Sequence, residues 1–289
     1  MSLNSATVGS VGEPFVKEVD ARWAMSYAAG LDDYLPCYMD TRRPGGVVAH
    51  PLFPVCFEWP VMLATRDSAL EREEALRGVH ATHDLVIHRL VRSDDTLTTQ
   101  ATVVGVEQRK PGAYQIVRFD TTDADGALVC STWYGTLFRG VTVEGGDKPA
   151  TELPTQMGSV SGEGTARAEI PVSISAGAAH VYTECARIWN PVHTDPAVAA
   201  TSGLPGLILH GTATLAHGVS RIVAQEAGGQ PERIKRIAGR FGAMVLMPSQ
   251  VTVRVLSRAA GADGEVVRFE VRTEDGKPAV RDGLVVLRL

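Results

Sequence analysis

The chain has 289 residues, of which 44% are hydrophobic and 21% charged, and its formal net charge is −5. This composition is ordinary for a globular protein with a sizeable core, and the negative charge gives no bulk attraction to nucleic acid or an anionic membrane. The four cysteines show neither disulfide-framework nor zinc-site spacing. Without a secretory signal or a membrane-length apolar run, we expect a cytoplasmic protein with reduced, buried thiols.

The N-terminus, residues 1–14, is predicted to be a loose tail. After it, a short helix and an irregular turn precede an apolar helix at residues 51–70. β-Branched residues, partial alternation and turn signals then predict three strands, at residues 97–108, 113–126 and 127–140. Residues 143–164 are rich in Gly, Pro and Ser and are predicted to be a linker. Beyond the linker the same order recurs, with an apolar helix at 211–227 and strands at 251–258, 266–276 and 284–289.

The two halves also repeat residue by residue. Tyr27, Pro36 and Asp40 lie 155 residues before Tyr182, Pro191 and Asp195, and His50 lies 160 residues before His210. Asp125-Gly126 lies 150 residues before Asp275-Gly276. The order and slow drift of these offsets predict two α+β units, at residues 10–145 and 155–289, each with a central helix on an antiparallel sheet.

One pair of motifs in the second half is the most specific signal. Asn190-Pro191-Val192-His193 is followed by the aliphatic-His-Gly segment Leu207–Gly211. In these motifs the sequence resembles the MaoC-like dehydratase and (R)-specific enoyl-CoA hydratase family in its double hot-dog form. The resemblance covers nearly the whole chain, from Gly12 onward, and implies two hot-dog units that pair as a pseudo-dimer.

The sequence departs from the family motif at the catalytic carboxylate. The family places an Asp five residues before the His, where this chain has Ile188, and Arg187 replaces the usual small residue before it. The first half shows the reverse, with Asp33 at the Asp position and Tyr38 at the His position. In the family both groups come from the same half, so Asp33 is not expected to reach His193.

The resemblance assigns chemistry to three residues. His193 suits a general base because the ordinary pKa of His is near neutrality, and Pro191 restricts the turn that carries it. Asn190 would hold the water or the turn. Gly211 is the candidate oxyanion donor, because helix N-termini present N–H groups to negative charge. The alternatives are that His193 caps nearby backbone and that Gly211 is a plain helix-start glycine.

Other polar residues near the motifs receive weaker assignments. Arg187, Ile188 and His210 are expected to border the substrate, and His210 is predicted to be structural because His50 repeats it in the half without the catalytic His. Asp195 is predicted to be a helix N-cap before Pro196. Glu184 is the nearest upstream carboxylate, and a solvated helix face explains it best.

Two further groups of residues, one of histidines and one of apolar side chains, could in principle bind a ligand. His80, His83 and His88 lack zinc-site spacing, so no metal is expected. Phe53, Phe57, Trp59 and Met62 would line an acyl tunnel or fill the core, and core is the better explanation for most of them.

The predicted function is hydration or dehydration of an enoyl-CoA or 3-hydroxyacyl-CoA thioester, with no cofactor apart from the coenzyme A of the substrate. Because Ile188 removes one acid-base group, a dicarboxylic substrate that supplies its own carboxylate is also considered, with Arg187 as the partner of that carboxylate. The alternatives are a thioesterase of the same fold and a non-catalytic acyl-CoA binding protein. No nucleic acid or membrane partner is expected, and a homodimer is left open.

Overall fold

The computed structural model describes residues 2–155 and 165–289, which form two compact units. We call Met1–Glu18, Phe57–His88 and Thr96–Gly158 the N-terminal unit, and Val19–Cys56, Arg89–Asp95 and Ser159–Leu289 the C-terminal unit. The C-terminal unit therefore also contains the first helix of the chain, α1 (Ala21–Ala29). The ranges 10–145 and 155–289 describe the two repeats of the sequence, and as domain boundaries they remain a prediction.

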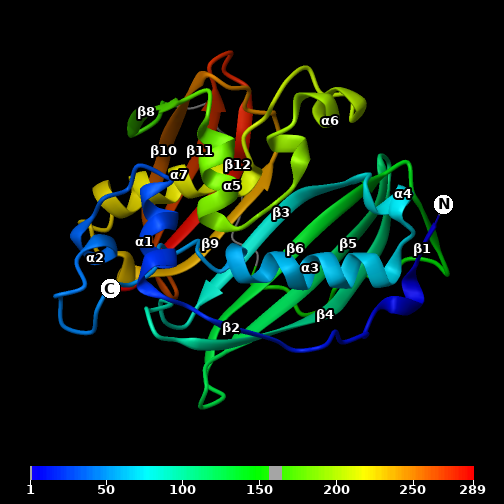
Figure 1. The fold of residues 1–289 in the computed structure, drawn as a ribbon, viewed down its shortest axis with the longest axis horizontal. Coiled ribbons are helices and arrows are strands. Elements are labelled where there is room, and N and C mark those ends of the chain that lie inside the picture. The colour runs from blue at the N-terminus through cyan, green and yellow to red at the C-terminus, as the bar shows by residue number, and fades with distance from the viewer. Residues whose placement is uncertain (1, 156–164) are drawn as a thin grey trace. The chain divides into compact units, whose positions relative to one another are not determined.

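The N-terminal unit is built on a five-stranded antiparallel sheet that α3 (Val55–Ala69) crosses on one face (Figure 1). The short helix α4 (Arg72–Ala75) follows α3. In spatial order the strands are β2 (Phe15–Glu18), β4 (Thr96–Arg109), β5 (Gly112–Thr122), β6 (Leu128–Arg139) and β3 (Gly78–Ile87).

The core of this unit lies between α3 and the sheet. Val61 and Met62 of α3 form one buried cluster with strand residues that include Val117 and Phe119. Leu3 belongs to the same cluster and is fully buried. The expectation of a loose N-terminal tail is therefore wrong: β1 (Ser2–Asn4) pairs in parallel with β7 (Thr142–Glu144), and η1 (Ser5–Thr7) follows β1.

The C-terminal unit repeats this design. Its helix α7 (Gly211–Gln225) packs on four strands of a second five-stranded antiparallel sheet. In spatial order the strands are β8 (Ala168–Ile174), β10 (Ser249–Gly261), β11 (Gly264–Thr273), β12 (Pro278–Leu287) and β9 (Ile234–Phe241). The unit also contains several short helices, namely α2 (Pro36–Met39), α5 (Ala178–Ala186), η2 (Pro191–His193), α6 (Pro196–Thr201) and η3 (Pro231–Arg233).

The two sheets have the same strand connectivity, since the order β2-β4-β5-β6-β3 corresponds element by element to β8-β10-β11-β12-β9. Even the hairpin turns match. Gly126 and Gly276 both adopt positive φ, 79° and 77°, and each donates its N–H to the residue three positions earlier. The predicted α+β class and double hot-dog fold are confirmed.

Prolines explain where the structure departs from the predicted helix ends. Helix α3 begins at Val55 rather than at residue 51, and residues 51–54 form turns. Pro54 disfavours helical backbone at Phe53 before it, so the helix starts only after this proline. The predicted linker, residues 143–164, begins inside β7, and its residues 156–164 lie outside the described part of the chain.

Candidate active site

The turn that carries His193 is set by local hydrogen bonds. Helix α5 ends at Ala186, and its C-cap Arg187 adopts left-handed backbone with φ 58° and donates its N–H to the Thr183 carbonyl. The Asn190 side chain accepts from the N–H of Val192 at 3.4 Å, just as η2 begins. After the turn, Asp195 Oδ1 accepts from the N–H of Ala197 at 2.8 Å, which confirms Asp195 as an N-cap.

A carbonyl of the chain holds the His193 ring. Its Nδ1 lies 2.9 Å from the backbone oxygen of Ile208, so Nδ1–H donates and Nε2 is the unprotonated nitrogen. Burial lowers the pKa of His193, and the bond to Ile208 opposes that effect. At neutral pH this ring is therefore a neutral imidazole with Nε2 able to accept a proton.

His210 stacks on His193, with ring centroids 3.7 Å apart and planes at 28°. His210 Nε2 lies 3.3 Å from Thr183 Oγ1, and the backbone carbonyl of Ile188 lies beside the ring. Burial, and then the neighbouring His193, lower the pKa of His210. The structure thus brings together His193, His210 and the backbone of Ile188, the position where the family has its Asp.

The other predicted border residues have distinct surroundings. The Ile188 side chain is buried, and its N–H donates to the Thr183 carbonyl at 3.1 Å. The Arg187 guanidinium lies 4.0 Å from the ring centroid of Trp23, whose Nε1 donates to the Cys185 carbonyl at 3.1 Å. Arg187 therefore stacks on an indole, a contact that the sequence pattern gave no sign of.

Gly211 is the first residue of α7, where the leading N–H groups have no partner within the helix. A Cβ at this position would lie 3.1 Å from Cδ1 of Phe241. The absence of a side chain is therefore explained by close packing against Phe241. Because packing alone accounts for the glycine, the oxyanion role of Gly211 remains a prediction.

The first-half counterparts of these residues form a different arrangement. His50 Nδ1 accepts from the N–H of Leu52 at 3.1 Å, so its Nε2–H donates to Ser220 Oγ at 3.1 Å. Tyr38 is tilted against His50, with ring centroids 5.8 Å apart, instead of stacked on it. The Asp33 carboxyl lies beside Ser220 and the Leu35 backbone, and burial raises its pKa.

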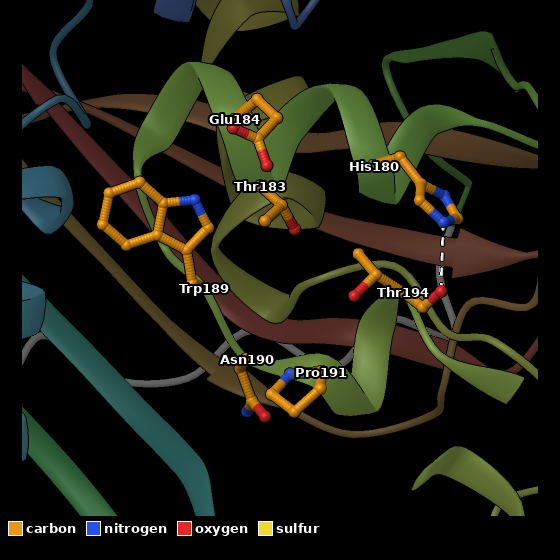
Figure 2. A pocket seen from close by; sticks show the side chains of 7 residues that line it. All are labelled: His180, Thr183, Glu184, Trp189, Asn190, Pro191 and Thr194. Atoms are coloured by element: carbon orange, nitrogen blue, oxygen red, sulfur yellow. Dashed lines mark hydrogen bonds between the residues drawn. The ribbon is translucent and has the colours of Figure 1, made fainter. Parts of the chain in front are cut away.

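An open groove borders the turn on the α5 side, with a volume of about 480 Å³. Figure 2 shows its walls, which α5 and the turn provide. The lining residues are His180, Thr183, Glu184, Trp189, Asn190, Pro191 and Thr194. The exposed Glu184 is thus part of a groove wall, while His180 Nε2 bonds the Thr194 carbonyl at 3.0 Å. Sequence reasoning missed this groove, because the exposure of Trp189 is seen only in the structure.

The apolar side chains that were considered for an acyl tunnel lie in or near the core. Phe53, Phe57 and Met62 are buried and Trp59 is half-buried, which agrees with a core role. Within residues 2–155 and 165–289, no three His, Cys, Asp or Glu side chains gather so that they could hold a metal ion. No helix in that part of the chain is long and apolar enough to cross a membrane.

Two family models match the sequence. Residues 161–276 match the MaoC like domain, and residues 6–132 match the FAS1-like, dehydratase domain region. Residues 161–276 are thus a MaoC like domain, which confirms the resemblance in the half of the chain that carries the motifs. A solved MaoC-like dehydratase from Phytophthora capsici has the same fold, with a TM-score of 0.84 and 21% identity over 96% of this chain and 95% of that one.

Curated relatives carry hydratase and synthase names. It is 24% identical over 221 residues to the peroxisomal enoyl-CoA hydratase 2 of Arabidopsis thaliana, covering 73% of this chain and 68% of that protein. It is 36% identical over 110 residues to the fatty acid synthase subunit beta of Aspergillus oryzae, and spans 5% of that protein's length with 32% of its own. Because the Arabidopsis relative is named peroxisomal, a cytoplasmic location stays a prediction.

Proposed function

We propose that the chain adds water to a 2-enoyl-CoA thioester, or removes it from a 3-hydroxyacyl-CoA, with His193 as the base. The name of the Arabidopsis relative supports this reaction class. The observation that carries the assignment is the bond from His193 Nδ1 to the Ile208 carbonyl, which directs the basic lone pair to Nε2. Ordinary neutral water needs such a base for attack at C3 of the enoyl group.

Ile188 leaves His193 without a carboxylate at the family position, so one imidazole would serve both proton transfers. Nε2 takes a proton from water as the oxygen attacks C3, which gives an imidazolium and an enolate. The imidazolium then returns that proton to C2, so water is added across the double bond and His193 is regenerated. Burial disfavours the imidazolium, and pairing with the enolate offsets that cost.

The enolate oxygen needs a hydrogen-bond donor, and the N–H of Gly211 is our candidate. Its place at the first turn of α7 favours negative charge there. Loss of one such donor typically lowers the rate by about 10²- to 10³-fold. Asn190 would help position the attacking water or the turn itself. The coenzyme A part of the thioester is the only cofactor group that this reaction requires.

Three proteins test the assignment: wild type, Ile188→Asp and His193→Ala. Each is assayed by loss of enone absorbance on a short 2-enoyl-CoA and on a dicarboxylic one. We expect Ile188→Asp to hydrate the short substrate faster than wild type, because it restores the second acid-base group, and His193→Ala to lose activity. Equal rates for wild type and His193→Ala would place the chemistry elsewhere.

The same reactions are followed with a thiol reagent. Release of free coenzyme A without loss of the enone would identify a thioesterase, and binding without either signal would identify a non-catalytic acyl-CoA protein. A preference of wild type for the dicarboxylic substrate, lost in Arg187→Ala, would support substrate-assisted hydration. The structure places Arg187 against Trp23, so this last outcome requires the guanidinium to leave the indole.

A further inference from the structure

The groove beside α5 contains groups that the hydration chemistry does not use. Trp189 and Glu184 both line it, and neither takes part in the proton transfers assigned to His193. We propose that this groove binds the adenine base of the coenzyme A portion of the substrate, an inference that rests on the proposed function. The volume of about 480 Å³ lies within the range of small-molecule sites.

Trp189 supplies a flat surface for a base. Its side chain is 60% exposed although Trp is among the residues that bury most area, so a large indole stands open at the groove. Figure 2 shows the ring at one end of the groove. Planar bases stack on exposed aromatic side chains of this kind in many nucleotide-binding proteins. The exposed indole therefore favours a ligand with an aromatic ring.

Glu184 selects among aromatic rings. It lies on the α5 wall near Trp189 (Figure 2), and an ionised carboxylate only accepts hydrogen bonds. Adenine carries an exocyclic amine that donates, whereas hypoxanthine has a carbonyl oxygen at that position. Stacked on Trp189, adenine would donate a hydrogen bond from its amine to Glu184. Hypoxanthine would instead place its carbonyl oxygen against the carboxylate.

The remaining walls limit which part of the nucleotide lies in the groove. The seven lining residues include no Lys or Arg, and Glu184 would repel a phosphate. The polar side chains of Asn190 and Thr194 suit the 2′-hydroxyl, which is the one free hydroxyl of the coenzyme A ribose. The phosphates are therefore placed outside the groove, and a nucleoside without phosphate is a fair probe of it.

The groove also adjoins the imidazole pair. Thr183 lines it and lies 3.3 Å, through Oγ1, from His210 Nε2. Asn190 lines it and accepts from Val192 within the turn that carries His193. A ligand that fills the groove therefore contacts the turn that carries His193.

Adenosine and inosine test the groove without turnover. The full chain is labelled with 5-fluorotryptophan, and the Trp189 signal, assigned by its absence in Trp189→Phe, is followed by fluorine NMR. We expect adenosine to shift this signal and inosine to bind at least about tenfold more weakly. Glu184→Gln should narrow that difference, because an amide also donates to the inosine carbonyl. Trp189→Ala should weaken adenosine binding about tenfold, measured by calorimetry.

Trp133→Phe, in the N-terminal unit, is the matched control and should bind adenosine like wild type. Equal binding of the two nucleosides, or no shift of the Trp189 signal, would overturn the assignment. Preferential binding of a simple organic cation such as tetramethylammonium would overturn it too, since Trp and Glu also recognise cations.

Steady-state kinetics on two thioesters distinguish a failure of the groove assignment from a failure of the proposed function. Trp189→Ala should raise KM for an enoyl-CoA by about tenfold and leave KM for the matching enoyl-pantetheine unchanged. If both thioesters are hydrated and Trp189→Ala affects them alike, the groove assignment fails while the function stands. If adenosine binds as expected but neither thioester reacts, the hydratase proposal fails, and binding of adenine in the groove is retained.

Discussion

His193 and His210 stack face to face, with ring centroids 3.7 Å apart. Each ring shields the other from water, and protonating one disfavours protonating the other, as the lowered pKa of His210 illustrates. The structural role of His210 stays a prediction; within the stack, burial lowers the pKa of both rings and so favours their neutral forms.

Replacing His210 should therefore change His193. In His210→Ala water enters the vacated space, and we expect the pKa of His193 to rise toward its ordinary value, measured by NMR titration of its ring carbons. His50→Ala is the matched control, because the repeat counterpart of His210 contacts Tyr38 and Ser220 instead. An unchanged His193 pKa in His210→Ala would mean that the stack does not control its protonation.

The pH dependence of hydration follows from the same geometry. The base must be neutral, and burial lowers the pKa of His193. The rate should therefore rise with pH through a midpoint below the ordinary His value of about 6.5 and stay level at neutral pH. A pH series of kcat/KM checks this. A rate that falls as pH rises through neutrality would show that the essential group acts as an acid.

A double variant can distinguish a packing role of Gly211 from a role in the hydration reaction. In Gly211→Ala the new Cβ meets the Phe241 ring at 3.1 Å, and we expect destabilisation of about 1–3 kcal/mol by overpacking. Adding Phe241→Leu should restore the free energy of unfolding, measured with urea. If hydration also requires the thioester to approach residue 211 closely, the double variant should still hydrate the substrate more slowly than wild type. Recovery of the rate together with stability would leave Gly211 only a packing role.

Buried Glu58 should make the stability of the N-terminal unit depend on pH between mildly acidic and neutral conditions. Its carboxyl bonds Thr132 Oγ1 at 2.6 Å, and burial raises its pKa to about 8 from 4.5. The unfolded chain releases this proton near pH 4.5 and the folded chain only near pH 8. The free energy of unfolding should therefore fall as pH rises between these values, by up to about 1.4 kcal/mol per pH unit.

Urea unfolding across this pH range tests that linkage. Glu58→Gln should remove the loss of stability, because an amide does not titrate. Thr132→Val keeps the carboxyl and removes a bond that lowers its pKa, so the loss should persist and extend to higher pH. Parallel curves for wild type and Glu58→Gln would contradict a protonated Glu58 in the folded unit.

Three consecutive strands of each unit and the turn chemistry between them were predictable because they are local and repeated, whereas β2, β3, β8 and β9 were not predicted. Asp125-Gly126 and Asp275-Gly276 predicted two hairpins, and both glycines adopt the positive φ that such turns need. The repeat also predicted that Tyr27 corresponds to Tyr182, and their hydroxyl groups lie 3.3 Å apart. The motif predicted which residues surround His193, but the sequence could not show that His210 stacks on it.

Contacts between side chains that are far apart along the chain could not be predicted, because no local sequence pattern encodes them. Leu3 has an unremarkable neighbourhood in the sequence, yet it is buried by pairing of its strand with residues 142–144. Thr183 resembles any helical threonine until the fold brings His210 to its hydroxyl. The groove depends on how α5 and the turn after it are placed, which the spacing of residues does not determine.

The most direct test of the account is the hydration rate of a short 2-enoyl-CoA by His193→Gln under single-turnover conditions. Gln retains side-chain polarity but cannot act as a base, so the rate should fall by about 10²- to 10⁴-fold. The exposed His88→Gln serves as the control and should react like wild type. A His193→Gln protein that folds and hydrates at the wild-type rate would show that His193 is not the base.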